Sequence, residues 1–333
     1  MGPSIPRTSV DWKDEPLFKD SSLVEVRILT DMKELLRDRG EERSYHPAQI
    51  TYEGLEEGKM LPVELKVRGN FRRSRANCAF PPIRLKFKKD SVKQTLFHGQ
   101  KKLKLVTHCQ NSASFEQFLV QEYLVYRMYN QLTDASFRVR MVKVSYEDVN
   151  GKGKPILKYG FLIEDEKDVA KRAGGDLVEV KNIHPRDCQP HNEVLVSLFA
   201  FMIGNTDWSI PNLHNVKMVQ PLEVGKGPIA VPYDFDWSGI INAPYANPNP
   251  TLGLDDVTDR LYRGFKQSPD RFDTAFALFN EKKAAIYALY NNNPYLKAST
   301  QKKAIRYLDK FYEIINSEKT REKLIISQCR TDR

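Results

Sequence analysis

The sequence predicts an α+β fold in two lobes, with a sheet and one long helix first and a mainly helical part after them. Alternating apolar and polar residues mark strands in the first half, whereas apolar residues at helical spacing dominate the second. The length of 333 residues also exceeds what one small core requires. We expect an N-terminal arm over 1–20, a sheet-rich lobe over 21–167 and a helical lobe over 168–333.

Short alternating runs define the start of the predicted sheet. They cover 24–28, 61–68, 83–87 and 103–106, and Asp31 opens a short helix after the first run. Because an antiparallel sheet packs one face on the core and leaves the other to solvent, such runs predict an antiparallel sheet with turn-rich connections.

A long helix and a hairpin complete the first lobe. Ser114 is suited to cap a helix whose apolar and aromatic residues form one stripe up to residue 132. Two further alternating runs, 139–146 and 156–163, flank a Gly-Lys-Gly-Lys turn, which is typical of a β-hairpin.

The second half reads as helices interrupted by one hairpin. A strongly apolar helix is predicted over 193–203, and two longer helices over 271–290 and 300–326. Between them, the runs 216–219 and 228–233 enclose a turn rich in Pro and Gly, which predicts a second hairpin.

Composition and charge restrict the classes of function that this chain is expected to have. With 41% hydrophobic residues and 29% charged residues, the chain is expected to fold over most of its length. The net charge is +9, but the basic residues are scattered in short clusters at 72–75, 86–89 and 101–104. A solvated basic face is the favoured interpretation, a phosphate site the second, and a nucleic-acid groove the least favoured, so no nucleic-acid partner is expected.

The cysteines and the chain start leave the compartment open. The four cysteines are widely spaced without a CxxC pair, so no zinc site is expected and a chain of this size needs no disulfide scaffold. The longest apolar run, 194–203, is too short for a membrane span. No signal peptide is visible, but the Met-Gly-Pro-Ser start is compatible with a removed leader and hence with export to the cell envelope.

The segment from Gly204 to Gly239 carries the most pointed chemistry. The apolar helix ends at Gly204 and delivers Asp207 onto a loop that also holds Asn212 and Asn215. Buried backbone that leads to polar side chains on a loop is how active sites are commonly built. The alternative is that these residues only cap and stabilise turns.

The second hairpin is expected to bring several of these oxygens together. Paired residues of antiparallel strands lie about 5 Å apart, so Asn215 and Asp234 should become neighbours, with Asp207 beside them. Asp236 should share a face with Asp234 because side chains alternate along an extended segment. Carboxylate and amide oxygens in one cluster suit Mg²⁺ or Mn²⁺, and this pattern predicts phosphoryl transfer.

A phosphate-binding turn and a lysine are expected in the first lobe. Arg68, Gly69, Asn70 and Arg72 follow a strand, and guanidinium groups in a flexible turn suit phosphates as paired donors.

A buried ion pair is expected between the sheet and the long helix. Glu122 lies within the apolar stripe of that helix, and an unpaired buried carboxylate is very costly. Lys86 or Lys104, each within a strand, is the expected partner, and either is also a candidate to contact a nucleotide; a solvated strand lysine is the alternative.

The order of these motifs resembles a known family. The stretches 68–70, 84–87, 207–215 and 233–236 together resemble the CotH-type (spore-coat CotH-like) atypical protein kinases and, more distantly, HipA-like and lipid kinases. The overall look is also that of uncharacterised bacterial envelope proteins. The resemblance runs over about residues 60 to 240.

This resemblance implies a bilobed protein-kinase-like fold, with an antiparallel-sheet N-lobe, a mainly helical C-lobe and ATP between them. It makes Asp207 the catalytic-loop acid, with Asn215 and Asp234 as metal ligands. For the nucleotide, the implied residues are Lys86, its helix partner Glu122 and Glu164 near the adenine.

The sequence departs from the family pattern in three places. No Gly-x-Gly-x-x-Gly loop is present. Asn212 stands five residues after Asp207, as in ordinary protein kinases, so it is an alternative ligand to Asn215. Phe235 is followed by Asp236 rather than Gly, so either Asp234 or Asp236 is a candidate metal ligand.

The sequence therefore predicts an ATP- and Mg²⁺-dependent phosphotransferase that acts on an unidentified protein or small-molecule acceptor. One alternative is a non-catalytic pseudokinase or envelope binding protein that uses the basic face and the Asn/Pro-rich segment 242–251. A weaker alternative is a metal-dependent phosphoesterase that uses the same carboxylates with water as nucleophile.

Overall fold

The computed structural model describes residues 16–291 and 293–331. Most of the expected N-terminal arm lies outside the described residues; within them, the short 3₁₀ turn η2 covers Pro16–Phe18. The chain divides into two compact units. The first unit takes the described residues up to Asn111 together with Arg138–Gly174, and the second takes Ser112–Phe137 together with the described residues from Gly175 onward.

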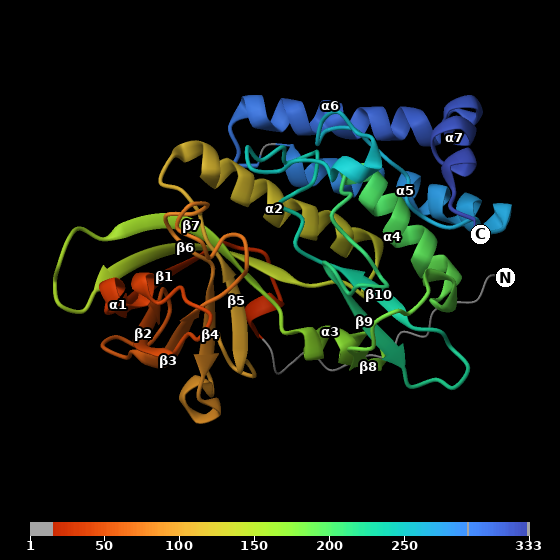
Figure 1. Ribbon diagram of the computed structural model, residues 1–333. Helices are drawn as coiled ribbons and strands as arrows, with labels where there is room; N and C mark the ends of the chain where they lie inside the picture. The colour runs from red at the N-terminus through yellow and green to blue at the C-terminus, as the bar shows by residue number, and fades with distance from the viewer. Residues whose placement is uncertain (1–15, 292, 332–333) are drawn as a thin grey trace. The chain divides into compact units, whose positions relative to one another are not determined.

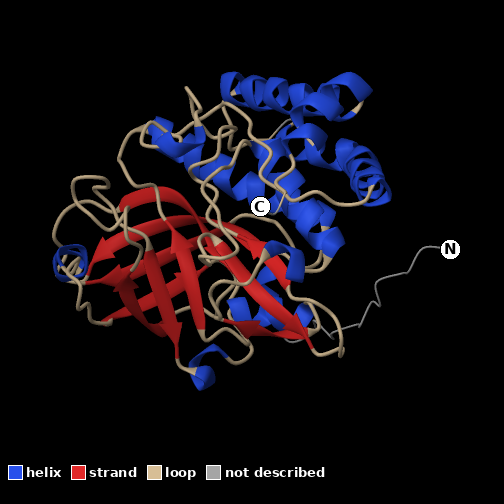
Figure 2. Ribbon diagram, turned by 45° about the vertical axis from the view of Figure 1, so that its right-hand side comes forward, coloured by secondary structure: helices blue, strands red, loops and turns tan. Residues whose placement is uncertain are grey.

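The first unit is built on a closed seven-stranded barrel (Figures 1 and 2). Around the barrel the strand order is β1-β2-β3-β4-β5-β7-β6. The strands are β1 Val24–Thr30, β2 His46–Tyr52, β3 Leu61–Val67, β4 Ile83–Phe87, β5 Lys102–Val106, β6 Val139–Asp148 and β7 Ile156–Ile163. The short helix α1 Met32–Arg37 and the 3₁₀ turn η3 Lys89–Val92 lie between these strands in sequence, and a second short helix, α3 Glu166–Arg172, follows β7.

Parallel pairing between the first and sixth strands closes the barrel. Val24 lies opposite Val142 and Thr30 opposite Asp148, whereas every other strand pair of the barrel is antiparallel. The predicted bilobed protein-kinase-like fold with an antiparallel-sheet N-lobe is therefore wrong. The sheet is mixed and has no free edge, because β1 supplies the hydrogen bonds that would otherwise be open on β6.

Alternation along each strand fills the barrel. In β1 the side chains of Val24, Val26 and Ile28 are buried, while those between them are exposed or half-buried. β3 and β4 repeat the same pattern. This period of two is why the alternating runs of β1, β3, β4, β5, β6 and β7 were found from the sequence. β2 was missed because its alternation is interrupted and it carries Pro47.

The second unit combines helices with a small antiparallel sheet (Figure 1). Its sheet has the order β10-β9-β8. The elements are α2 Ala113–Leu132, β8 Gly175–Val178, α4 Pro190–Ile203, β9 Val216–Pro221, β10 Ile229–Pro232, α5 Pro269–Tyr290, α6 Ala298–Ile315 and α7 Glu318–Leu324, with 3₁₀ turns η4 Pro185–Asp187, η5 Pro250–Leu252 and η6 Ile326–Gln328. The predicted hairpin is confirmed, since β9 and β10 pair antiparallel.

Two helix predictions need correction. The long helix α2 was assigned to the sheet-rich lobe, but it belongs to the second unit, where it packs against α5. The single helix predicted over 300–326 is divided at Asn316–Ser317 into α6 and α7. Asn and Ser disfavour helix interiors because their side chains compete for backbone hydrogen bonds.

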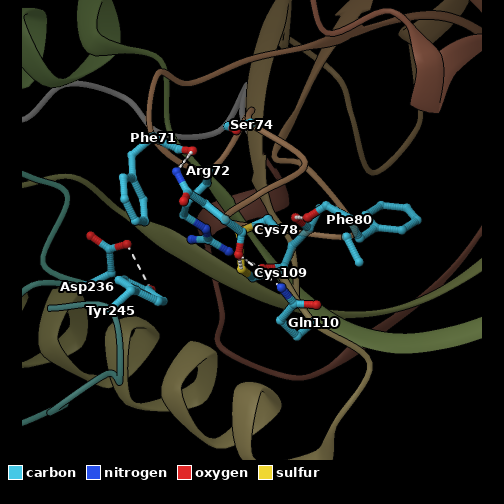
Figure 3. The surroundings of a disulfide bond; sticks show 12 residues. Phe71, Arg72, Ser74, Cys78, Phe80, Cys109, Gln110, Asp236 and Tyr245 are labelled. Atoms are coloured by element: carbon cyan, nitrogen blue, oxygen red, sulfur yellow. Dashed lines mark hydrogen bonds between the residues drawn. A yellow bond between two sulfur atoms is a disulfide. The ribbon is translucent and has the colours of Figure 1, made fainter.

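A disulfide that the cysteine spacing did not predict joins Cys78 to Cys109 in the first unit (Figure 3). It ties the loop after β3 to the segment after β5. Phe80 N–H donates to the Cys109 carbonyl at 2.9 Å, and the Gln110 amide donates to the Asn77 carbonyl at 3.0 Å. Disulfides persist in oxidising compartments, which is consistent with the expectation of export.

Breaking this disulfide should lower the stability of the first unit. The bridge joins two residues with a sequence separation of 31. The chain-entropy model predicts that closing such a loop stabilises the folded state by about 3–4 kcal/mol. We expect the double variant Cys78→Ser/Cys109→Ser to lose that much free energy of unfolding in urea titrations. Cys188→Ser, at a free buried cysteine, is the control. Equal stability of the double variant and the wild type would contradict the expectation.

His108 is a buried titratable group of the first unit. Its side chain is 1% exposed, and its ring packs 4.7 Å from the ring of Phe80. Burial, together with the positive charges of Lys158 and Arg72, lowers the pKa of His108 from about 6.5 to about 4. The folded protein therefore holds this imidazole in its neutral form at neutral pH.

His108 should make the free energy of unfolding decrease as the pH falls. Its pKa is lower in the folded state, so between about pH 6.5 and 4 the unfolded chain binds a proton that the folded chain does not. The contribution of His108 is complete above pH 6.5, and about 3 kcal/mol is lost as the pH falls to 4. His108→Phe should flatten this part of the stability profile, whereas His191→Phe at an exposed position should leave it unchanged. Parallel profiles would refute the assignment.

Within the described residues, no helix has the length and hydropathy required to cross a membrane.

Candidate functional site

The candidate site begins where α4 ends. α4 is buried from Glu193 to Ile203, and Gly204 ends it in a left-handed conformation with φ 64°. Glycine adopts this backbone without the steric cost that a Cβ brings. The next residue, Asn205, is buried, and its side-chain oxygen accepts a hydrogen bond from Asp207 N–H at 2.9 Å. The helix end therefore sets the backbone direction at Asp207.

The loop after Asp207 is held from two sides. Ser209 and His214 exchange backbone hydrogen bonds of 2.9 Å in both directions and close the loop as a short antiparallel bridge. Arg263 donates from Nη1 to the carbonyls of Thr206 and Trp208, on either side of Asp207. The loop therefore has a fixed backbone although it contains no regular element.

Both carboxylate oxygens of Asp207 have partners. Oδ1 lies 2.7 Å from His214 Nε2, and Oδ2 accepts from Asn215 Nδ2 at 2.9 Å. The same amide group also donates to the Asp207 carbonyl at 2.8 Å. Because both contacts of this amide are to acceptors, its oxygen Oδ1 faces away from Asp207. The Asp207 side chain is 35% exposed and that of His214 54%, so the cluster opens to solvent.

The hairpin joins the segment that carries Asp234 to this cluster through the backbone, with an offset of one residue from the predicted register. Pro232 lies opposite Val216, and Tyr233 N–H donates to the Asn215 carbonyl at 2.9 Å. The residue facing Asn215 is therefore Tyr233, and Asp234 follows it.

The Asp234 backbone is unusual, and its carboxylate is open. Asp234 has φ 64°, and its N–H donates to the Tyr126 hydroxyl of α2 at 2.8 Å. Within 16–291 and 293–331, no side chain pairs with the Asp234 carboxylate. Asp236 is buried and accepts from the Tyr245 hydroxyl at 3.0 Å (Figure 3).

Backbone hydrogen bonds fasten the segment after Asp234 to the end of α4. Gly239 N–H donates to the Gly204 carbonyl and Ile240 N–H to the Ile203 carbonyl, both at 3.0 Å. Phe235, in the same segment, is buried and packs against Tyr126, with the two ring centroids 4.7 Å apart. The two polar segments, 204–215 and 233–240, are therefore joined at both ends.

The donor set fits a hard divalent cation only in part. Asn215 Oδ1 and the Asp234 carboxylate are oxygens with no protein partner among the described residues, and Mg²⁺ commonly uses one or two carboxylates together with water and substrate phosphates. However, no group of three or more His, Cys, Asp or Glu side chains converges on a metal position within the described residues. Asn212, the alternative ligand, is exposed on the far part of the loop.

The residues expected to contact a nucleotide in the first unit take part in ion pairs. Lys86 Nζ lies 2.8 Å from Glu64 and Lys104 Nζ lies 3.2 Å from Glu166. Glu164 is 1% exposed and pairs with Arg172.

Glu122 is buried on α2, as its place in the apolar stripe predicted. The proposed link between Glu122 and Lys86 or Lys104 stays a prediction.

The expected phosphate-binding turn has an ordered backbone. Arg68 N–H donates to the Pro82 carbonyl at 2.9 Å, and Gly69 has φ 90°, which favours glycine. Arg72 donates to the Thr107 carbonyl, and the next residue, Arg73, pairs with Glu41 at 2.6 Å. These two guanidinium groups stabilise the neighbouring loops, and a role for Arg68, Asn70 or Arg72 toward phosphate stays a prediction.

Sequence reasoning missed three residues that shape the site. Arg263 holds the loop backbone, the Tyr126 hydroxyl accepts a hydrogen bond from Asp234 N–H, and the Tyr245 hydroxyl donates to Asp236. Arg263 and Tyr126 are distant in sequence from the residues they contact, and Tyr245 lies in an irregular segment, so periodicity gives no sign of these contacts. The one available signal was a tyrosine within an apolar stripe, since a buried hydroxyl needs a partner.

No protein-family model matches this chain, and the search of curated proteins found no significant match.

Substituting the glycine that ends α4 should disturb the site. A Cβ at Gly204 would meet the Tyr307 hydroxyl at 2.0 Å, and alanine is strained at φ 64°. We expect Gly204→Ala to lower the free energy of unfolding by about 2–4 kcal/mol. Gly225→Ala, with φ 83° and no atom within 4 Å of its Cβ, should show only the backbone cost of about 1 kcal/mol. Equal losses in the two variants would contradict the steric argument.

Proposed function

We propose that this protein is a phosphotransferase that uses ATP and Mg²⁺, with Asp207 as its catalytic residue and an acceptor that carries a hydroxyl group. The observation that carries the proposal is the hydrogen-bonded cluster of Asp207, His214 and Asn215, on a loop that backbone hydrogen bonds join to the segment carrying Asp234. The proposal rests on this site in the second unit and does not require the kinase-like fold that the structure contradicts.

Asp207 is suited to orient and deprotonate the acceptor. Its carboxylate is held through both oxygens, which fixes its direction, and each oxygen retains a lone pair for a further donor. As the acceptor oxygen forms its bond to the γ-phosphorus of ATP, the bond from that phosphorus to the ADP oxygen breaks and the hydroxyl proton passes to Asp207. Fixing the acceptor oxygen in line supplies most of the advantage.

His214 and Asn215 act on Asp207 rather than on substrate. The hydrogen bonds from His214 and Asn215 fix the direction of the carboxylate that accepts the proton. Asn215 directs its remaining oxygen away from Asp207, and Asp234 supplies an open carboxylate. These two oxygens are the proposed ligands of Mg²⁺, which would neutralise charge on the ATP phosphates.

The proposal predicts a loss of phosphoryl transfer in two variants that conserve shape. Asp207→Asn should lower the rate of metal-dependent ATP turnover or autophosphorylation about a hundredfold or more, because it removes the proton acceptor. Asp234→Asn should cause a loss of similar size and weaken the dependence on Mg²⁺, since it removes a charged oxygen ligand. Asp255→Asn, at an exposed acid that makes no hydrogen bond or ion pair within the described part of the chain, is the matched control and should retain full activity.

Four other outcomes would contradict the proposal. Thermal stabilisation by ATP and Mg²⁺ without turnover would indicate a non-catalytic nucleotide-binding protein, and no stabilisation at millimolar ligand would remove the nucleotide altogether. Hydrolysis of a model phosphate ester without any acceptor, lost in Asp207→Asn, would assign the site to a phosphoesterase. Full phosphoryl transfer in both Asp207→Asn and Asp234→Asn would place the chemistry elsewhere.

A further inference from the structure

A cavity of about 260 Å³ lies in the second unit, against the loop that follows Asp207. Loop residues from Trp208 to Asn212 form one wall, and Glu193 of α4 and the segment around Arg263 form others. Asp207, Asn215 and Asp234 do not line it, so this cavity is separate from the candidate phosphoryl-transfer site. It is smaller than the roughly 300–1,000 Å³ typical of pockets for drug-sized ligands, so it suits a small molecule or one end of a larger one.

The Trp208 indole contributes a hydrogen-bond donor without a partner. Trp208 is 8% exposed, and its Nε1–H is buried with no hydrogen-bond acceptor among the described residues. A buried N–H without an acceptor is costly, and each such group in a folded protein needs an explanation. An acceptor atom on a ligand in the cavity would satisfy it.

Two arginines add positive charge to the same cavity. Arg263 uses Nη1 for the loop carbonyls, and its other guanidinium nitrogens make no hydrogen bond to the described residues. Arg330 lies with its guanidinium 4.9 Å from the ring centre of Phe265, and its side chain likewise makes no hydrogen bond there. Burial and the charge of Arg330 lower the pKa of Arg263, which shows that the two cations repel each other.

The acid of the cavity does not cancel this charge. Glu193 is 1% exposed and already accepts from Phe265 N–H and Ser197 Oγ, both at 3.1 Å. Its carboxylate therefore already has protein donors, to which the Gln267 amide adds a contact of 3.5 Å, and burial raises its pKa. Two arginines against one acid leave the lining with a net positive charge, and an anion between the arginines would relieve their repulsion.

We propose that this cavity binds a small oxyanion, a carboxylate or a phosphate group, through Arg263, Arg330 and the indole N–H of Trp208. Planar guanidinium groups bind both kinds of group through paired hydrogen bonds, and the indole N–H supplies a further directed donor. The inference stands without the proposed phosphotransferase activity, because it depends on none of the residues assigned to that reaction.

The test is isothermal titration of the whole chain with inorganic phosphate and, separately, with malonate, at constant ionic strength and without nucleotide or Mg²⁺. We expect saturable binding of at least one anion. Arg330→Gln should weaken it about tenfold or more, and Trp208→Phe several-fold. Arg330 is exposed, and the hydrogen bonds at this position are made by its backbone, so Arg330→Gln should fold. This holds even if Arg263→Gln, which releases the loop carbonyls, does not fold.

Arg306→Gln is the matched control, since it removes the same charge from an exposed position of α6 outside the cavity. It should bind as the wild type does, and so should Asp234→Asn. Binding of phosphate alone would identify a phosphate site, and binding of malonate alone a carboxylate site. Absence of saturable binding for both anions, equal affinities of Arg330→Gln and Arg306→Gln, or loss of binding in Asp234→Asn would overturn the inference.

Discussion

The candidate site depends on backbone hydrogen bonds that join two segments far apart in sequence. Gly239 and Ile240 donate to the last carbonyls of α4 at one end, and Tyr233 donates to Asn215 at the other. These bonds satisfy helix carbonyls that have no partner within the helix, and they involve no side chain. The backbone therefore holds the two segments together without help from the polar side chains between the two ends.

Unusual backbone conformations gather at the same place. Leu213, Asn215 and Asp234 all have positive φ, and Gly204 begins the loop with the same handedness. Asn and Asp tolerate this region better than other side chains, but a leucine there is strained. Such strain persists only where the surroundings determine the conformation, and it is concentrated at functional sites. Here the Ser209–His214 bridge and Arg263 provide those surroundings, so the strain and the function proposed for this loop have a common structural basis.

The sequence predicted local features well and distant pairings poorly. Period-two alternation located most barrel strands, and the turn between β9 and β10 identified their hairpin, because each signal lies within a few residues. The parallel pairing of β1 with β6 joins residues more than a hundred positions apart, so alternation could not distinguish a closed barrel from an open antiparallel sheet. The same limit explains the site: Asp207, His214 and Asn215 were within one loop, whereas Arg263 and Tyr126 were found only from the fold.

One loop separates two sets of charge in the second unit. On one side lie the oxygens of Asp207 and Asn215, and on the other the cavity with its positively charged lining. Arg263 contacts both, because it donates to the loop carbonyls around Asp207 and also lines the cavity. The negative charge of Asp207 raises the pKa of Arg263, whereas burial lowers it. An anion in the cavity would bind the remaining nitrogens of the same guanidinium that positions the loop backbone. Occupation of the cavity and the geometry at Asp207 are therefore physically coupled through a single side chain.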